Sequence, residues 1–128
     1  MSTRAIVARP TEGGGFAGRY LHQDGDPATA MRLLRDFVLL GHSGNVEAAT
    51  RILLDEHPFG WIDLPDAESD GECFCHSVET ASRLDTGLLT HESDADVEYA
   101  YVLHPDRLVA LAPGGDGWEP IRTSAWTH

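Results

Sequence analysis

The sequence predicts an α+β fold, in which an antiparallel or mixed sheet carries two helices on one face. Three observations support this prediction. Strand-like segments occur near both ends of the chain, as an N-terminal hairpin and a C-terminal meander of three strands. Two segments with helical spacing of apolar residues follow one another between them. The length of 128 residues suits one domain, 1–128, with an irregular acidic segment at about 58–96.

The N-terminal hairpin is predicted from two short apolar runs separated by turn residues. The runs are Ala5–Arg9 and Phe16–His22, and both have the composition of strands. Pro10 and the three glycines at 13–15 lie between them. Glycine reaches positive φ without steric cost, so the chain can reverse there.

Two helices are predicted to follow the hairpin. Asp26 is a good N-cap, and Pro27 suits the first helical position, where its missing N–H costs nothing. This helix ends at Gly41, and its apolar face consists of Ala30, Met31, Leu33, Leu34, Phe37 and Val38. The second helix starts near Asn45, another N-cap, and ends before Pro58; its apolar stripe is Val46, Ala49, Ile52 and Leu53.

The segment 58–96 gives weaker structural signals. Phe59 and Trp61 are expected to anchor its start on the core. A short strand is expected at Glu72–His76 and one or two helical turns at Ser77–Leu84. The rest is expected to be an irregular loop, and long loops of this kind are commonly functional or mobile.

The C-terminal third predicts a meander. Apolar and aromatic residues alternate over 97–103, and the turn His104–Arg107 has proline at its second position. The chain is then expected to return over Leu108–Ala112, turn at the glycines near 114–117, and form a third strand at Trp118–Thr123.

The charge of the chain is concentrated in one third of it. Residues 55–98 contain thirteen carboxylates and a single cation, Arg83, whereas the remaining residues balance eight acids with eight arginines. The net charge of −12 therefore belongs to this segment. Such a field repels nucleic acid and anionic membranes, and it attracts cationic proteins and metal ions. We expect a cationic protein partner, no direct binding of nucleic acid and no membrane association.

Cysteine usage and hydropathy suggest a cytoplasmic protein. Cys73 and Cys75 are one residue apart, so a disulfide between them would be strained and free thiols are expected. No apolar run approaches the ~18 residues that a membrane span needs. The N-terminal ten residues contain no hydrophobic stretch of the length found in secretory signals.

Three stretches resemble a group of small uncharacterised actinobacterial and phage proteins. They are Ser2–Ala5, Gly18–Pro27 with its His-Gln-Asp-Gly-Asp-Pro turn, and the late strand Glu98–Leu103. The resemblance covers most of the chain in order. It implies a single domain and a phage or bacterial host setting, and it implies no chemistry.

A second resemblance concerns the first residues only. Ser2-Thr3-Arg4, followed by a hairpin with Gly18-Arg19, is similar to the start of N-terminal-nucleophile amidases of the bile-salt and penicillin acylase kind. A terminal amine can act as the base for its own hydroxyl, which implies a small hydrolytic domain. Against this, 128 residues are too few for the four-layer fold of those enzymes.

Two stretches have the residue types of metal sites. Asp66–Gly71 matches the first half of a calcium loop, with acids at positions one, three and five and glycine at six, but position twelve is Ser77 rather than glutamate. Cys73, Cys75 and His76 are zinc-ligand types, with His57 or His22 available as a fourth ligand. A second cysteine pair is missing. Solvated turn residues and buried thiols are the alternative interpretations.

A polar turn precedes the first predicted helix. His22, Asp24 and Asp26 lie where exposed helical amides attract anions, and a His–Asp pair can move protons. The alternative is structural, because aspartates in such turns bond to local amides.

The sequence therefore favours a non-enzymatic acidic protein-interaction module, of a phage or plasmid accessory type, that binds a cationic host protein by a form of nucleic-acid mimicry. No catalytic residue is assigned. Metal binding, of zinc or calcium, and a small hydrolytic domain are the alternatives. The predicted partner-binding residues are Asp66, Glu68, Asp70, Glu72, Glu92, Asp94 and Asp96.

Overall fold

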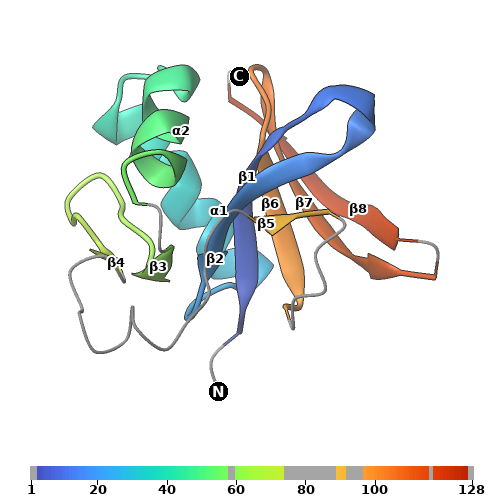
Figure 1. Cartoon of the computed structure of the whole chain (residues 1–128). Coiled ribbons are helices and arrows are strands. Elements are labelled where there is room, and N and C mark those ends of the chain that lie inside the picture. Colours follow the sequence, from blue (N-terminus) through green and yellow to red (C-terminus); the bar gives the residue numbers. More distant parts are fainter. Residues whose placement is uncertain (1–2, 58–59, 74–88, 92–96, 116, 127–128) are drawn as a thin grey trace.

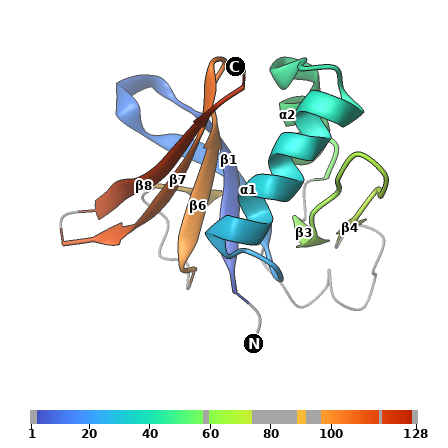
Figure 2. The same ribbon diagram turned by 180° about the vertical axis from the view of Figure 1, so that it is seen from behind.

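A computed structural model describes residues 3–57, 60–73, 89–91, 97–115 and 117–126. These residues form an eight-stranded mixed sheet with helices packed on one of its faces (Figures 1 and 2). Seven strands follow the spatial order β4-β3-β2-β1-β6-β7-β8, and the short strand β5 pairs with β2 beside that path. The α+β class predicted from the sequence is confirmed.

The N-terminal hairpin forms as predicted. Strands β1 (Ala5–Pro10) and β2 (Phe16–Leu21) pair antiparallel, with Ala5 opposite Leu21. A short 3₁₀ turn, Glu12–Gly14, joins them. Gly13 and Gly14 both have positive φ, +83° and +86°, which explains why the turn uses glycine.

Both helices begin at the predicted caps. Helix α1 (Pro27–Asp36) starts after Asp26, whose carboxylate accepts a hydrogen bond from the Thr29 amide at 3.1 Å. One π-helical turn, η2 (Phe37–Gly41), extends it to the predicted end. Helix α2 (Val46–Leu54) starts after Asn45, whose side-chain oxygen accepts from the Ala48 amide at 3.1 Å.

Helix α2 ends earlier than the sequence predicts, at Leu54 rather than just before Pro58. The amides of Asp55 and Glu56 both donate to the carbonyl of Arg51, which closes the last turn. The following carbonyls accept hydrogen bonds from other parts of the fold. A proline is therefore not needed to stop this helix.

The C-terminal meander also forms as predicted. Strands β6 (Tyr99–Leu103), β7 (Arg107–Gly114) and β8 (Gly117–Ala125) pair antiparallel in sequence order. Strand β6 pairs in parallel with β1, with Ala5 opposite Tyr99. This parallel pairing joins the N-terminal hairpin to the meander and makes the sheet mixed.

The two faces of the sheet have separate apolar clusters. On the helical face, Leu34, Val38 and Leu53 pack with Val7 and Tyr101 in one cluster that includes both helices. The opposite face has a smaller cluster, made of Ile6, Ala8, Phe16, Ala100 and Val102, with Trp118 packed against it. The rings of Phe16 in β2 and Trp118 in β8 lie 5.5 Å apart, so the sheet curls until distant strands touch on this face.

Part of the acidic segment belongs to the sheet. Strands β3 (Trp61–Asp63) and β4 (Glu72–Cys73) form an antiparallel hairpin, and β5 (Leu89–Thr90) pairs with β2. The sequence predicts a strand near Glu72 but not the strand at 61–63. Strand β3 runs parallel to the end of β2, and the amides of His22 and Gln23 donate to the carbonyls of Trp61 and Ile62.

Candidate functional site

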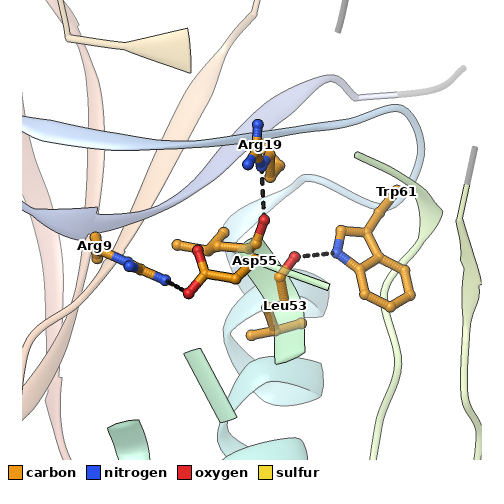
Figure 3. A network of polar contacts seen from close by, with 6 residues as sticks. Arg9, Arg19, Leu53, Asp55 and Trp61 are labelled. Carbon is orange, nitrogen blue, oxygen red and sulfur yellow. Dashed lines mark hydrogen bonds and ion pairs between the residues drawn. The ribbon is translucent and has the colours of Figure 1, made fainter. Parts of the chain in front are cut away.

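The β3–β4 hairpin, residues 60–73, is attached to the C-terminal end of helix α2 (Figure 3). The indole Nε1 of Trp61 donates to the carbonyl of Leu53 at 2.9 Å. The guanidinium Nε of Arg19, in β2, donates to the carbonyl of Leu54 at 2.7 Å. Trp61 is buried, with 1% of its surface exposed. Strand β2 and the hairpin thus each donate a hydrogen bond to the end of α2. They bond to two helix carbonyls that would otherwise be unpaired.

An ion pair lies beside this junction. The guanidinium of Arg9 and the carboxylate of Asp55 are 2.9 Å apart, and both side chains are partly exposed. Burial lowers the pKa of Arg19, and the charge of Asp55 opposes that change. Asp55 is one of the thirteen acids counted in the sequence. In the structure it pairs with Arg9 and lies near Arg19, so the arginines of the first two strands balance its charge at the surface.

The connection between β3 and β4, which contains the predicted calcium-loop residues, is a compact turn. The Asp66 carboxylate accepts hydrogen bonds from the amides of Glu68, at 2.9 Å, and Ser69, at 2.8 Å. Gly71 has a φ of +67°, and a Cβ there would lie 2.6 Å from the carbonyl oxygen of Asp63. Aspartate and glycine are therefore needed for the turn itself. Among the described residues, no three His, Cys, Asp or Glu side chains are arranged to hold a metal ion.

The hairpin has a strongly one-sided charge. Residues 60–73 contain five carboxylates and neither arginine nor lysine. Glu68, Asp70 and Glu72 are exposed, and within the described part of the chain no arginine forms an ion pair with them. These three carboxylates are available to a cationic partner, whereas Asp66 holds its own turn.

Two carboxyl groups are forced together at the base of the hairpin. Burial raises the pKa of the Asp63 carboxyl above its usual range. The charges of Asp24 and Glu72, and a hydrogen bond with Asp24, raise this pKa further, whereas His22 lowers it. Like charges kept this close repel one another, so a cation placed here would be attracted.

The residues of the predicted polar turn, His22, Asp24 and Asp26, have two different roles. Asp26 is structural, as the cap of α1. His22 and Asp24 lie next to Asp63 and so belong to the acidic edge. The ring nitrogen Nδ1 of His22 is 2.9 Å from the hydroxyl of Tyr20. The carboxylate that Asp24 meets, that of Asp63, comes from a strand that was not predicted from the sequence.

A cavity of about 390 Å³ opens beside the hairpin. Its apolar lining comes from η2, α2 and the hairpin: Phe37, Ile52, Trp61 and Pro65. The exposed carboxylate residues Asp70 and Glu72 also line it, together with His57, whose ring centroid is 4.2 Å from that of Trp61. Aromatic and apolar residues beneath two carboxylates are the lining chemistry that suits an organic cation.

Several predicted site residues cannot be compared with the structure. Glu92, Asp94, Asp96, Cys75 and His76 lie outside the described residues, and for Cys73 only its place in β4 is described. The zinc hypothesis therefore stays a prediction. Sequence reasoning missed the cavity because its walls come from separate elements. The one available signal was Trp61, an isolated tryptophan among the acids.

Comparison with protein-family models, with curated proteins and with solved structures gives no match. Within the described ranges, no helix is long and apolar enough to cross a membrane.

Proposed function

We propose that this protein is an acidic interaction module that binds a cationic protein through the β3–β4 hairpin. The observation that supports this most strongly is the combination of charge and attachment. Three exposed carboxylates without arginine partners in the described structure project from a hairpin that Trp61 ties to α2. A surface that served only solubility would mix both charges. A surface of one charge sign on a fixed hairpin instead favours fast and selective association with an oppositely charged protein.

The experiment measures binding of a fluorescent oligo-arginine peptide by anisotropy. One variant combines Glu68→Gln, Asp70→Asn and Glu72→Gln, and leaves Asp66 in place because its carboxylate holds the turn. A matched control variant removes the same charge from exposed acids elsewhere, namely Glu12→Gln, Glu47→Gln and Glu119→Gln. Both variants have the same net charge, so the comparison isolates position.

We expect the hairpin variant to bind at least several-fold more weakly than the control variant. Binding should also weaken between about 0.1 M and about 1 M salt, because the Debye length falls from ~10 Å to ~3 Å. Equal weakening by the two variants would show that only total charge matters and would refute a binding role for the hairpin.

A further inference from the structure

We infer that the cavity beside the hairpin receives one arginine side chain of the partner protein. This inference rests on the proposed function and adds to it a defined anchor. A generally acidic surface attracts any cation, whereas a cavity with aromatic walls can distinguish one cation from another.

The lining of the cavity matches the two parts of an arginine side chain. The methylene groups of arginine can pack on Ile52, which is partly exposed at the apolar wall, whereas Phe37 and Pro65 line the cavity with little exposed surface. The guanidinium can then lie against the partly exposed ring of His57, which packs on the buried Trp61, and reach the carboxylates at the opening. Asp70 and Glu72 are both exposed, and both accept hydrogen bonds only, when ionised.

Arginine fits this site better than lysine on chemical grounds. A guanidinium is planar, stacks on aromatic rings and donates two parallel hydrogen bonds to a carboxylate, whereas an ammonium is a compact and strongly hydrated charge. Removing a guanidinium from water therefore costs less free energy than removing an ammonium. A cavity with buried apolar walls selects the more weakly hydrated cation.

The electrostatics of the hairpin base support the same occupant. Glu72 is opposite Asp63 in the β3–β4 ladder, and Asp63 also meets Asp24. These three acids repel one another. Of the groups that face Asp63, the His22 ring is the one that acts against this repulsion. A guanidinium at Glu72 would relieve it. Glu68, on the exposed turn, would meet further cations of a protein partner, which favours a protein over a free small molecule.

The test uses three small probes that differ in one property each: N-acetyl-arginine amide, its citrulline analogue and N-acetyl-lysine amide. Citrulline keeps the shape and loses the charge, and lysine keeps the charge and loses the planar group. Binding is followed by ¹H–¹⁵N NMR at the Trp61 indole N–H and the Gly71 amide, both of which belong to residues that line the cavity.

We expect saturable shifts at both positions with the arginine probe. The citrulline probe should bind roughly tenfold or more weakly, the factor expected from losing charge-assisted hydrogen bonds. The lysine probe should bind several-fold more weakly than arginine. Equal binding of arginine and citrulline, or shifts that avoid Trp61 and Gly71, would overturn the inference.

Two variants separate the cavity from the acidic surface. Ile52→Phe enlarges a wall side chain without changing charge, and should abolish the shifts of the arginine probe. Glu72→Gln removes one carboxylate at an exposed position, where folding is not at risk, and should weaken the probe roughly tenfold. The cavity inference fails if the Ile52→Phe variant still binds both the arginine probe and the oligo-arginine peptide. The proposed function nevertheless stands if, in the same experiment, the hairpin charge variant no longer binds the oligo-arginine peptide. If neither charge nor wall variant affects oligo-arginine binding, both fail.

Discussion

Replacing Trp61 by phenylalanine tests whether the indole hydrogen bond holds the acidic hairpin to helix α2. The side chain is 1% exposed, and its Nε1 donates to the Leu53 carbonyl at 2.9 Å. Phenylalanine keeps an aromatic ring in place and removes the donor. The substitution therefore leaves a buried carbonyl without this partner and empties part of the space that the indole fills.

The expected loss of unfolding free energy follows from these two changes. An unsatisfied buried carbonyl costs about 1–3 kcal/mol. Phenylalanine also lacks the indole nitrogen and two ring carbons, and the two carbons add about 1.6 kcal/mol at about 0.8 kcal/mol for each buried CH₂ equivalent. Together the two changes predict that Trp61→Phe destabilises the protein by about 3–5 kcal/mol. The measurement is urea unfolding followed by far-ultraviolet circular dichroism, which does not depend on tryptophan fluorescence.

Trp126→Phe is the matched control. Trp126 is also buried, and its Nε1 donates to the carbonyl of His104 at 2.6 Å, on the meander. We expect it to destabilise the protein by a similar amount without changing oligo-arginine binding measured below the unfolding transition. Trp61→Phe should reduce both. A loss below about 0.5 kcal/mol for Trp61→Phe, smaller than the net value of an ordinary hydrogen bond, would refute the anchoring role.

Two further predictions concern the acidic edge and the core. Because the pKa of Asp63 is raised on folding, its contribution to stability is present at acidic pH and is lost as the pH rises above its ordinary value of 3.8. Asp63→Asn should therefore raise the melting temperature at neutral pH and lose this advantage below pH 3.8; an equal gain at both pH values would contradict the assignment. Tyr101→Phe should cost about 1–3 kcal/mol in chemical denaturation, because the buried Tyr101 hydroxyl donates to the Gly25 carbonyl and that carbonyl would lose this partner; an unchanged midpoint would show that another group replaces the donor.

Features set by neighbouring residues could be predicted from the sequence. Asp26 and Asn45 were recognisable as helix caps because a cap acts on amides three residues away. The alternation over 99–103 predicted a strand with two different faces. In the structure, Tyr101 packs with the helices, and Ala100 and Val102 pack on the opposite face.

Features that join distant residues could not be predicted in this way. The parallel pairs β1–β6 and β2–β3 connect residues far apart in sequence, and no local pattern specifies them. The short strand Trp61–Asp63 lies beside the residues that follow β2, and its carbonyls accept hydrogen bonds from the amides of His22 and Gln23, which would otherwise lack acceptors. Asp66–Gly71 was ambiguous for a different reason. Aspartate, serine and glycine suit both a calcium loop and a tight turn, and in the structure the Asp66 carboxylate accepts hydrogen bonds from the amides of its own turn.

The position of Trp61 explains how one hairpin can combine a strong charge with a defined shape. Repulsion among Asp24, Asp63 and Glu72 opposes folding of this edge, so the edge needs a contribution from uncharged contacts. The buried indole supplies that contribution on the inner side of the hairpin, and it also lines the cavity. Substitution of the exposed acids Glu68 and Asp70, which lie outside this repulsive group, should change binding and leave stability nearly unaltered, since exposed charges contribute little to folding. Substitution of Trp61 should change both, because the same ring holds the hairpin in place and lines the proposed arginine site.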